Sequence, residues 1–415
     1  MENSLIGSLS SLAPGSIITM IAIDKLGRKA MLLIYWLLIM ICWIIMTITE
    51  NLYAIWIAIF IGGCGASAAY LGVAVYISEI ADVEVRTPLN GLSTIFMSFG
   101  SVLIYILGPL LSFKMLNLLC GGVTVSFVFF YLLVPETPYF YVAKGDLENA
   151  QKSLCWLRRG ASKESIEKEM EELKNCAEQE NNNKMGFRDI VSSKAILKEF
   201  GAAFFILYIY TVCGQTPIGA YLQTIYEDIP LSYSPAYAVG GISIIGVIGG
   251  FPTPFAVKLI GDKALLISSM FGCTFGLAAM SAYFYFLEVG YDVSSMTIIP
   301  VASGYFLMML YACGLSGLIW ATVSDLFPPS VKGFGTGICG IYVSLLNFFF
   351  TEVFGLFKDA YGYGPTFLGL AVMVFISTFG LFFFPSLATL SLTEIQEYFE
   401  GNPAIKRKLS HKENI

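Results

Sequence analysis

The chain has 415 residues, of which 56% are hydrophobic and only 13% are charged, and its mean hydropathy is +0.72. Soluble domains carry about 25% charged residues, so a soluble fold of this length could not bury so much apolar surface. The net charge of −6 gives no indication of nucleic-acid binding. Composition therefore places the chain among membrane proteins.

Eleven apolar runs of spanning length follow one another along the chain. Each approaches the roughly 20 residues that a helix needs to cross the hydrocarbon layer. Because only helices and closed barrels satisfy their backbone in lipid, runs this long predict an all-α membrane protein. The runs cover residues 5–22, 30–48, 52–77, 90–111, 115–134, 200–222, 236–257, 264–287, 297–324, 334–356 and 364–385.

One long hydrophilic stretch separates the first five runs from the last six. It begins with Pro135-Glu136-Thr137-Pro138 and continues through an acidic and basic segment. We expect it to be a cytoplasmic connector of short helices. The predicted organisation is a transmembrane half at 1–134, the connector at 135–198, a second transmembrane half at 199–385 and a cytoplasmic tail at 386–415.

Positively charged residues predict the orientation of the chain. If the loop at 24–29 is cytoplasmic and the sides alternate, 22 of the 24 Lys and Arg residues lie inside, and only Lys114 and Lys358 lie outside. The C-terminus is then cytoplasmic and the N-terminus external. No signal peptide precedes the first run, so we expect that a helix upstream of it is missing.

The two halves repeat one another. Residues 24–29 (DKLGRK) and 258–263 (KLIGDK) occupy matching inside loops, and each has a glycine that permits a tight turn. Parallel repeats of this kind occur in transporters that rock one half against the other. On the next inside loop of each half, charges stand seven residues apart, as Glu79 with Arg86 and as Asp325 with Lys332.

We expect these loop charges to form a cytoplasmic gate of ion pairs that separate when the halves part. Each exposed pair contributes only about 0–1 kcal/mol, so several are needed to bias two conformations. The alternative is that the charges only set the topology. The predicted gate residues are Asp24, Gly27, Arg28, Lys29, Glu79, Arg86, Glu136, Asp325 and Lys332.

These motifs resemble the sugar porter branch of the major facilitator superfamily and, within it, the insect facilitated trehalose transporters. Residues 24–29 are similar to the family's D-x-x-G-R-[RK] loop, 76–86 to its Y-x-x-E…R loop, and 135–160 to its PETP…LRG connector. The resemblance covers nearly the whole chain from the second family helix onward, with the first family helix absent. It implies the major facilitator fold and transport by alternating access.

Several positions depart from the family pattern. Tyr139 stands where the family usually has Arg, and residues 210–214 (YTVCG) replace Q-Q-x-S-G in the seventh family helix. The two glutamines that hold sugar hydroxyls in the family are therefore absent. Trp320 keeps its place in the tenth family helix. The resemblance therefore predicts the fold of this chain better than it predicts the substrate.

A sugar site requires hydrogen-bonding groups and an aromatic face near the membrane midplane. An amide such as Gln215 is costly in lipid unless it faces a polar cavity, whereas Ser and Thr often bond within the helix bundle. Trp320 could instead be an interfacial anchor, and Pro217 predicts a kink beside the site. The predicted substrate-binding residues are Thr94, Ser98, Gln215, Thr216, Gln223, Trp320 and Asn347.

The predicted function is facilitated transport of a sugar, trehalose or a hexose, across the plasma membrane. Glu352 is the one ionisable residue inside a predicted span and lies near the outer end of its helix, which favours a facilitator over a proton symporter. No nucleophile–histidine pair, metal cluster or nucleotide loop occurs, so we expect no enzyme activity, metal or cofactor. We expect a monomer whose partners are the sugar and the bilayer, with no nucleic acid. The alternatives are a carrier of another small organic solute and a non-transporting sensor or relic of a sugar porter.

Overall fold

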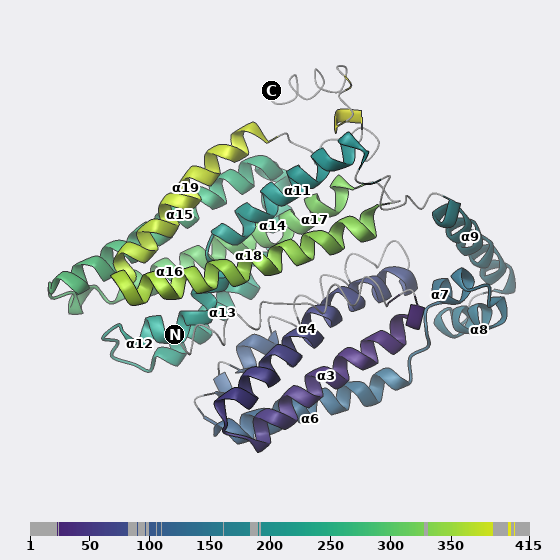
Figure 1. Ribbon diagram of the computed structural model, residues 1–415, viewed down its shortest axis with the longest axis horizontal. Coiled ribbons are helices and arrows are strands. Elements are labelled where there is room, and N and C mark those ends of the chain that lie inside the picture. Colours follow the sequence, from purple (N-terminus) through teal and green to yellow (C-terminus); the bar gives the residue numbers. More distant parts are fainter. Residues whose placement is uncertain are drawn as a thin grey trace. The chain divides into compact units, whose positions relative to one another are not determined.

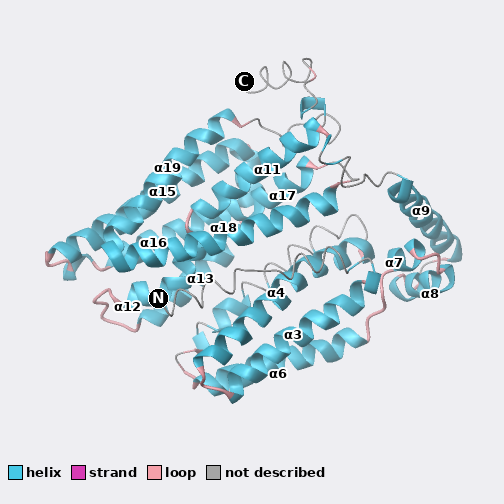
Figure 2. Ribbon diagram, in the orientation of Figure 1, coloured by secondary structure: helices cyan, strands magenta, loops and turns pink. Residues whose placement is uncertain are grey.

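The computed structural model describes residues 23, 25–81, 89, 96, 99–104, 106–108, 110–160, 162–182, 190, 192–327, 331–384, 397–399 and 402 (Figures 1 and 2). Within these residues the regular elements are helices and no strand occurs. The predicted all-α class is therefore confirmed. The described residues form two compact units, one holding 25–81 with 111–182 and the other holding 192–384 with the described part of 97–110.

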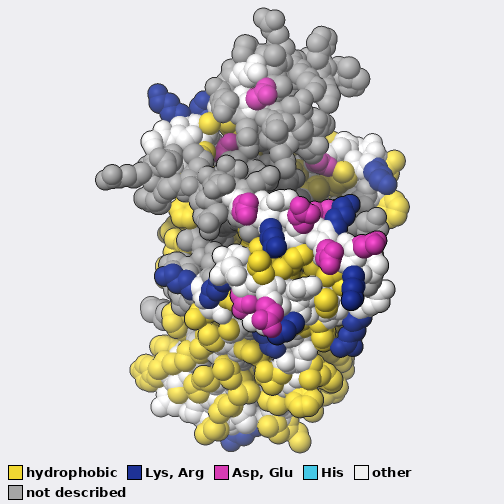
Figure 3. Space-filling model, turned by 90° about the vertical axis from the view of Figure 1, so that its right-hand side faces the viewer, with side chains coloured by type: hydrophobic (Ala, Val, Ile, Leu, Met, Phe, Trp, Pro, Cys, Tyr) yellow, Lys and Arg dark blue, Asp and Glu magenta, His cyan; other side chains and the backbone are white. Residues whose placement is uncertain are grey.

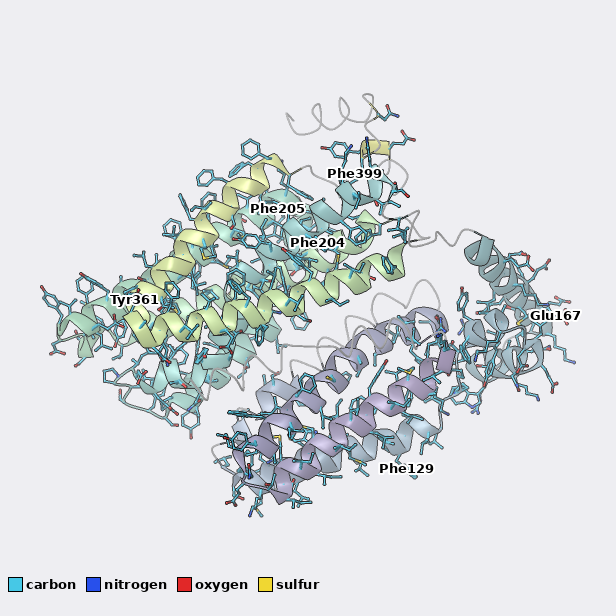
Figure 4. All side chains as sticks on the ribbon, viewed as in Figure 1. Phe129, Glu167, Phe204, Phe205, Tyr361 and Phe399 are labelled. Atoms are coloured by element: carbon cyan, nitrogen blue, oxygen red, sulfur yellow. The ribbon has the colours of Figure 1, made fainter. Side chains whose placement is uncertain are left out.

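Within its described residues, the first unit contains three long apolar helices, α3 (Arg28–Ile48), α4 (Leu52–Ile80) and α6 (Phe113–Leu132). Helix α3 packs against both of the others (Figure 1). Glycines let α3 and α4 approach closely, because a Cβ added at Gly65 would lie 2.8 Å from the Tyr35 carbonyl oxygen. Side chains such as Phe129 on α6 point away from the helices (Figure 4), and Phe129 is 66% exposed, as suits a lipid-facing residue.

The described part of the connector up to residue 182 forms the helices α7 (Pro138–Ala143), α8 (Leu147–Leu157) and α9 (Lys163–Asn182). Thr137 and Asp146 cap the N-termini of α7 and α8. Glu167 on α9 points outward (Figure 4). On the side that carries these helices, charged side chains gather above a mainly hydrophobic surface (Figure 3). This distribution suits an aqueous connector that joins apolar helices.

The second unit is a bundle of long and interrupted helices around one large hydrophobic core. Helices α15 and α19 pack along one another, as do α15 and α16, and α18 packs against α11 and α12. Its elements are α11 (Lys194–Val212), α12 (Gln215–Glu227), α13 (Pro235–Gly250), α14 (Thr253–Ile260), α15 (Asp262–Val289), the 3₁₀ helix η1 (Ser294–Met296), α16 (Ile298–Leu310), the π-helix η2 (Tyr311–Ser316), α17 (Gly317–Leu326), α18 (Lys332–Tyr361) and α19 (Tyr363–Phe383).

Most of the predicted spans correspond to helices. By length and composition, seven helical segments within the described residues could cross a membrane: Arg28–Ile48, Phe113–Leu132, Lys194–Glu227, Asp262–Val289, Ser294–Trp320, Phe334–Tyr361 and Tyr363–Phe383. Helix α4 covers the predicted run at 52–77, and the run at 236–257 is divided between α13 and α14. The run at 5–22 and most of that at 90–111 lie outside the described residues, so the count of eleven stays a prediction.

Candidate functional site

A buried ion pair joins the start of α3 to the end of α4. Nε of Arg28 donates to Oε1 of Glu79 at 2.9 Å, and Nη2 lies 2.8 Å from the same oxygen. The two side chains are only 6% and 13% exposed. The pair is therefore buried, and not an exposed loop pair as the sequence suggested. Breaking it costs more than the 0–1 kcal/mol of an exposed pair, because the remaining charge would stay buried.

Thr137 completes the coordination of the same carboxylate. Its hydroxyl donates to Oε2 of Glu79 at 2.6 Å and accepts from the backbone N–H of Phe140 at 3.3 Å. The side chain is fully buried. One hydroxyl thus caps α7 and ties it to α4.

Glu136 caps the N-terminus of α3. Its carboxylate accepts from the backbone N–H of Arg28 at 3.1 Å and from that of Lys29 at 2.9 and 3.1 Å. It also accepts from the N–H of Thr137 at 2.9 Å. The first N–H groups of a helix have no partner within the helix, and the helix dipole favours an anion there. Glu136 therefore fixes the connector onto α3.

Gly27 is required at this junction by both its backbone and its surroundings. Its φ of 99° is unfavourable for residues that carry a Cβ. An added Cβ would also overlap the Glu136 carboxylate. Gly261, at the matching place between α14 and α15, has a similar φ of 78° but no neighbouring atom within 4 Å of an added Cβ. The repeated glycine thus makes the same turn in both halves, and only Gly27 also makes room for a partner.

Tyr139, at the position where the resembled motif usually has Arg, contacts Arg28 of the ion pair with Glu79. The guanidinium of Arg28 lies 5.8 Å from the Tyr139 ring centre and 5.7 Å from that of Phe140. Contacts of this kind contribute about 0.5–1 kcal/mol at exposed sites and more when desolvated. At this position the chain therefore carries an aromatic contact to Arg28 in place of a second cation.

Two further residues hold the junction together, and sequence reasoning did not assign them. Tyr76 donates its hydroxyl to the Pro135 carbonyl oxygen at 2.5 Å. Arg158 donates to the Ile80 carbonyl at 3.1 Å and pairs with Glu169 at 2.8 Å. Tyr76 lies in the motif at 76–86 and Arg158 in the motif at 135–160. Their place in these motifs was the only feature of the sequence that could have indicated a role at the junction. Their bonds tie the connector to the end of α4.

The structure thus brings together five of the predicted gate residues. These are Gly27, Arg28, Lys29, Glu79 and Glu136. Asp24 and Arg86 lie outside the described residues. Asp325 lies in α17 and Lys332 begins α18, but the description does not extend to their side chains.

In the second unit, the predicted site lies at an interruption of a membrane helix. Helix α11 ends at Val212, and Gly214, with a φ of 78°, precedes α12. Gln215 and Thr216 are therefore the first two residues of α12, and both are partly exposed. Pro217 follows in the first turn, where proline is tolerated because no N–H partner is lost. The interruption thus lies at Gly214 and not at Pro217, where the sequence predicted a kink.

Aromatic rings gather beside this interruption. The Tyr210 ring, two residues before the end of α11, lies 5.6 Å from that of Tyr311 in η2. It also meets the edge of Trp320 in α17 at 6.2 Å. A π-helix such as η2 is rare and occurs frequently at functional sites. Sequence reasoning found Trp320 but missed both tyrosines, because neither differs in sequence from an ordinary core aromatic.

Helix α18, which packs against α11 and α12, carries two buried polar atoms. Oδ1 of Asn347 and Oγ1 of Thr351 are shielded from solvent and have no hydrogen-bond partner among the described residues. They stand four residues apart and so lie on one face of the helix. Buried polar atoms are costly without partners. They are therefore candidates for contact with a polar ligand.

The remaining predicted substrate residues are placed differently. Gln223 lies two turns beyond Gln215 on α12, is exposed, and donates to Glu227 at 2.9 Å. Thr94 and Ser98 lie outside the described residues. No group of three His, Cys, Asp or Glu suited to a metal occurs in the described part of the chain. The second unit therefore offers amide, hydroxyl and aromatic groups, which are suited to binding a neutral polyol.

The chain matches the model of one protein family over most of its length. Residues 8–399 match the family described as "Sugar (and other) transporter". Two similar relatives are the "Facilitated trehalose transporter Tret1" of Polypedilum vanderplanki and that of Bombyx mori. The first is 25% identical over 96% of this chain and 80% of its own length; the second is 26% identical over 100% and 82%.

Solved structures with a similar fold are those of a bacterial xylose transporter. The inward open conformation of XylE from E. coli has a TM-score of 0.78 at 18% identity and covers 95% of this chain and 89% of that one. The major facilitator superfamily proton:xylose symporter XylE bound to 6-bromo-6-deoxy-D-glucose has a TM-score of 0.72 at 17% identity, with coverage of 96% and 88%. These likenesses confirm the predicted major facilitator fold. The chain belongs to the Sugar (and other) transporter family.

Proposed function

We propose that this protein is a facilitator that carries trehalose or a hexose across the plasma membrane by alternating access, with its C-terminus in the cytoplasm. Family membership supports a sugar as the cargo. The observation on which the proposal rests is the interruption between α11 and α12. Gln215 and Thr216 begin α12, and Tyr210 near the end of α11 contacts the rings of Tyr311 and Trp320. Interrupted membrane helices form substrate sites in many transporters.

The chemistry of these groups suits a sugar. Aromatic faces contact the C–H faces of a pyranose ring, while amides and hydroxyls bond its hydroxyl groups. None of these side chains is a carboxylate, an ammonium or a guanidinium group. The site therefore favours an uncharged solute over an organic ion.

The junction of Arg28, Glu79, Thr137 and Glu136 acts as the cytoplasmic lock in this proposal. Its charges hold α3, α4 and α7 together in one conformation. A lock must exchange these contacts for water or for other partners when the path opens. All of these contacts lie within the first unit, so the junction biases the two states by as much as its own contacts differ between them.

A second candidate is a carrier of a different small organic solute. The observation that favours it is the sequence YTVCG at 210–214, which lacks the two glutamines of the family motif. Tyr210 fills that region with an aromatic ring instead. A smaller or less polar solute would fit such a site better than a disaccharide.

Uptake by cells that express the chain tests both candidates. We expect saturable uptake of labelled trehalose or glucose that excess unlabelled trehalose competes. Saturable uptake of another solute without competition by trehalose or hexoses would favour the second candidate. Normal surface expression without saturable uptake of any solute would favour the sensor alternative and contradict the proposal.

A further inference from the structure

Three sulfur atoms meet in the interior of the second unit. Cys213, at the end of α11, lies with its Sγ 3.2 Å from Sδ of Met270 on α15. The Cys213 thiol also donates to the Ile209 carbonyl oxygen at 3.4 Å, and it interacts with Cys273, one turn beyond Met270 on α15. All three side chains are fully buried. The cluster thus joins the interrupted helix to its neighbour α15.

We propose that Cys213, Met270 and Cys273 form a binding site for a soft monovalent metal ion of the Cu(I) type. Thiolate and thioether sulfur atoms are the ligands that select Cu(I) among the biological metals. Two thiols and one thioether supply three such ligands. Hard cations such as Mg²⁺ or Ca²⁺ find no oxygen ligands in this set.

The geometry needs only a small adjustment to hold an ion. With metal–sulfur bonds of about 2.3 Å, as in zinc thiolate sites, three ligands in a plane lie about 4 Å from one another. The Cys213 and Met270 sulfurs, now 3.2 Å apart, must therefore separate by less than 1 Å. Met270 has an unbranched side chain with three rotatable bonds, so it can make this movement without a change of the backbone.

The charge balance also suits a buried site. Cu(I) binds as one thiol loses its proton, so the ion replaces a proton and the complex of one thiolate, one thiol and one thioether is neutral. A neutral complex avoids the large cost of burying a net charge in the bundle.

Buried cysteines often serve only as small apolar residues, and Cys339 offers a matched control. It is fully buried in the same core but lies on α18. If all three cysteines were ordinary core residues, replacing any of them would change Cu(I) binding equally. If Cys213 and Cys273 are metal ligands, only their replacement weakens Cu(I) binding.

Competition for Cu(I) tests the proposal directly and does not depend on transport. Purified protein is titrated with the Cu(I) complex of bathocuproine disulfonate under ascorbate, and the loss of the coloured complex is measured. We expect the wild type to withdraw about one equivalent. Cys213→Ser and Cys273→Ser should weaken binding at least about tenfold, the size of effect seen even for residues that only support metal ligands. Cys339→Ser should bind as the wild type does.

Met270→Leu keeps the volume of the core and removes only the thioether, so it serves if a serine variant fails to fold. It should also weaken binding, with an unchanged size-exclusion profile. Equal Cu(I) affinity in the wild type, Met270→Leu and Cys339→Ser would overturn the proposal, as would the absence of stoichiometric binding by the wild type.

Discussion

The Thr137 hydroxyl donates a 2.6 Å hydrogen bond to Oε2 of Glu79, while Arg28 holds Oε1 of the same carboxylate. Thr137 and Glu79 are 58 positions apart in the sequence. Each oxygen of Glu79 thus has its own partner, one from the connector and one from α3. The carboxylate is the point at which three helices are joined.

Replacing Thr137 with Val should destabilise the protein. The substitution keeps the shape of the side chain but removes its hydrogen bond to the Glu79 carboxylate, and a hydrogen bond to a charged group contributes about 1.5–3 kcal/mol. Thr124→Val is the control, because that buried hydroxyl only donates to Cys120 of its own helix. Thermal unfolding in detergent should show a lower melting temperature for Thr137→Val than for Thr124→Val. Equal melting temperatures would mean that the Thr137 bond is not important.

Replacing Arg28 with Lys should impair the junction even though the charge remains. Lysine cannot donate from two nitrogens in the fixed geometry of the guanidinium, and it stacks less well on Tyr139 and Phe140. We expect a loss of about 2 kcal/mol or more in stability, below the 3–5 kcal/mol for removing one partner of a buried pair. Thermal unfolding measures the loss of stability, and uptake measures its effect on transport.

The exposed pair of Lys152 with Glu148 provides the comparison for Arg28→Lys. Lys152→Ala should change the melting temperature little, because exposed pairs contribute about 0–1 kcal/mol. A similar loss in the two variants would mean that the burial of Arg28 has no energetic consequence.

Substituting alanine for Gly27 and for Gly261 separates two physical effects. Both positions combine a positive φ with an extended ψ, a region open essentially to glycine, and another residue there costs about 1–3 kcal/mol. At Gly27 the added methyl also meets the Glu136 carboxylate, whereas at Gly261 it meets open space. Gly27→Ala should therefore lower the melting temperature more than Gly261→Ala does. Equal losses would show that Glu136 moves aside without cost.

The sequence was sufficient to predict this junction in part. Charges at fixed places in the loops identified Arg28, Glu79 and Glu136, because few charges occur in an apolar chain and each must find a partner. The role of Thr137 could not be predicted, since it depends on the fold bringing the connector to the end of α4. The burial of the ion pair between Arg28 and Glu79 likewise could not be predicted from their positions in loops.

The second unit was harder to predict from sequence. Trp320 and Gln215 stood out because they are polar or large within apolar spans. The π-helix at Tyr311–Ser316 leaves no mark in an apolar run, because the extra residue in its turn changes neither composition nor polarity. The sequence predicted a kink at Pro217. The helix is instead interrupted at Gly214, between α11 and α12, because glycine readily adopts the positive φ found there.

Replacing Trp320 with Ala should abolish saturable uptake without loss of surface protein. The substitution removes the ring that meets Tyr210 and that the proposed site presents to the sugar. Trp156→Ala, in the exposed part of α8, is the control and should transport normally. Uptake and surface labelling are measured on the same cells. Unchanged uptake in Trp320→Ala would remove the residue from the site.

Replacing Thr351 with Val should separate stability from substrate binding. The Thr351 hydroxyl is buried without a partner among the described residues, so an apolar side chain of the same shape should leave stability unchanged or raise it by about 1 kcal/mol or more. If the hydroxyl binds the sugar, the same change should raise the KM for uptake. Thr378→Val is the matched control, because that fully buried hydroxyl already donates to Val374 of its own helix at 2.8 Å, and the substitution should leave the KM unchanged. A Thr351→Val protein with a lower melting temperature and an unchanged KM would show that the hydroxyl serves the fold and not the substrate.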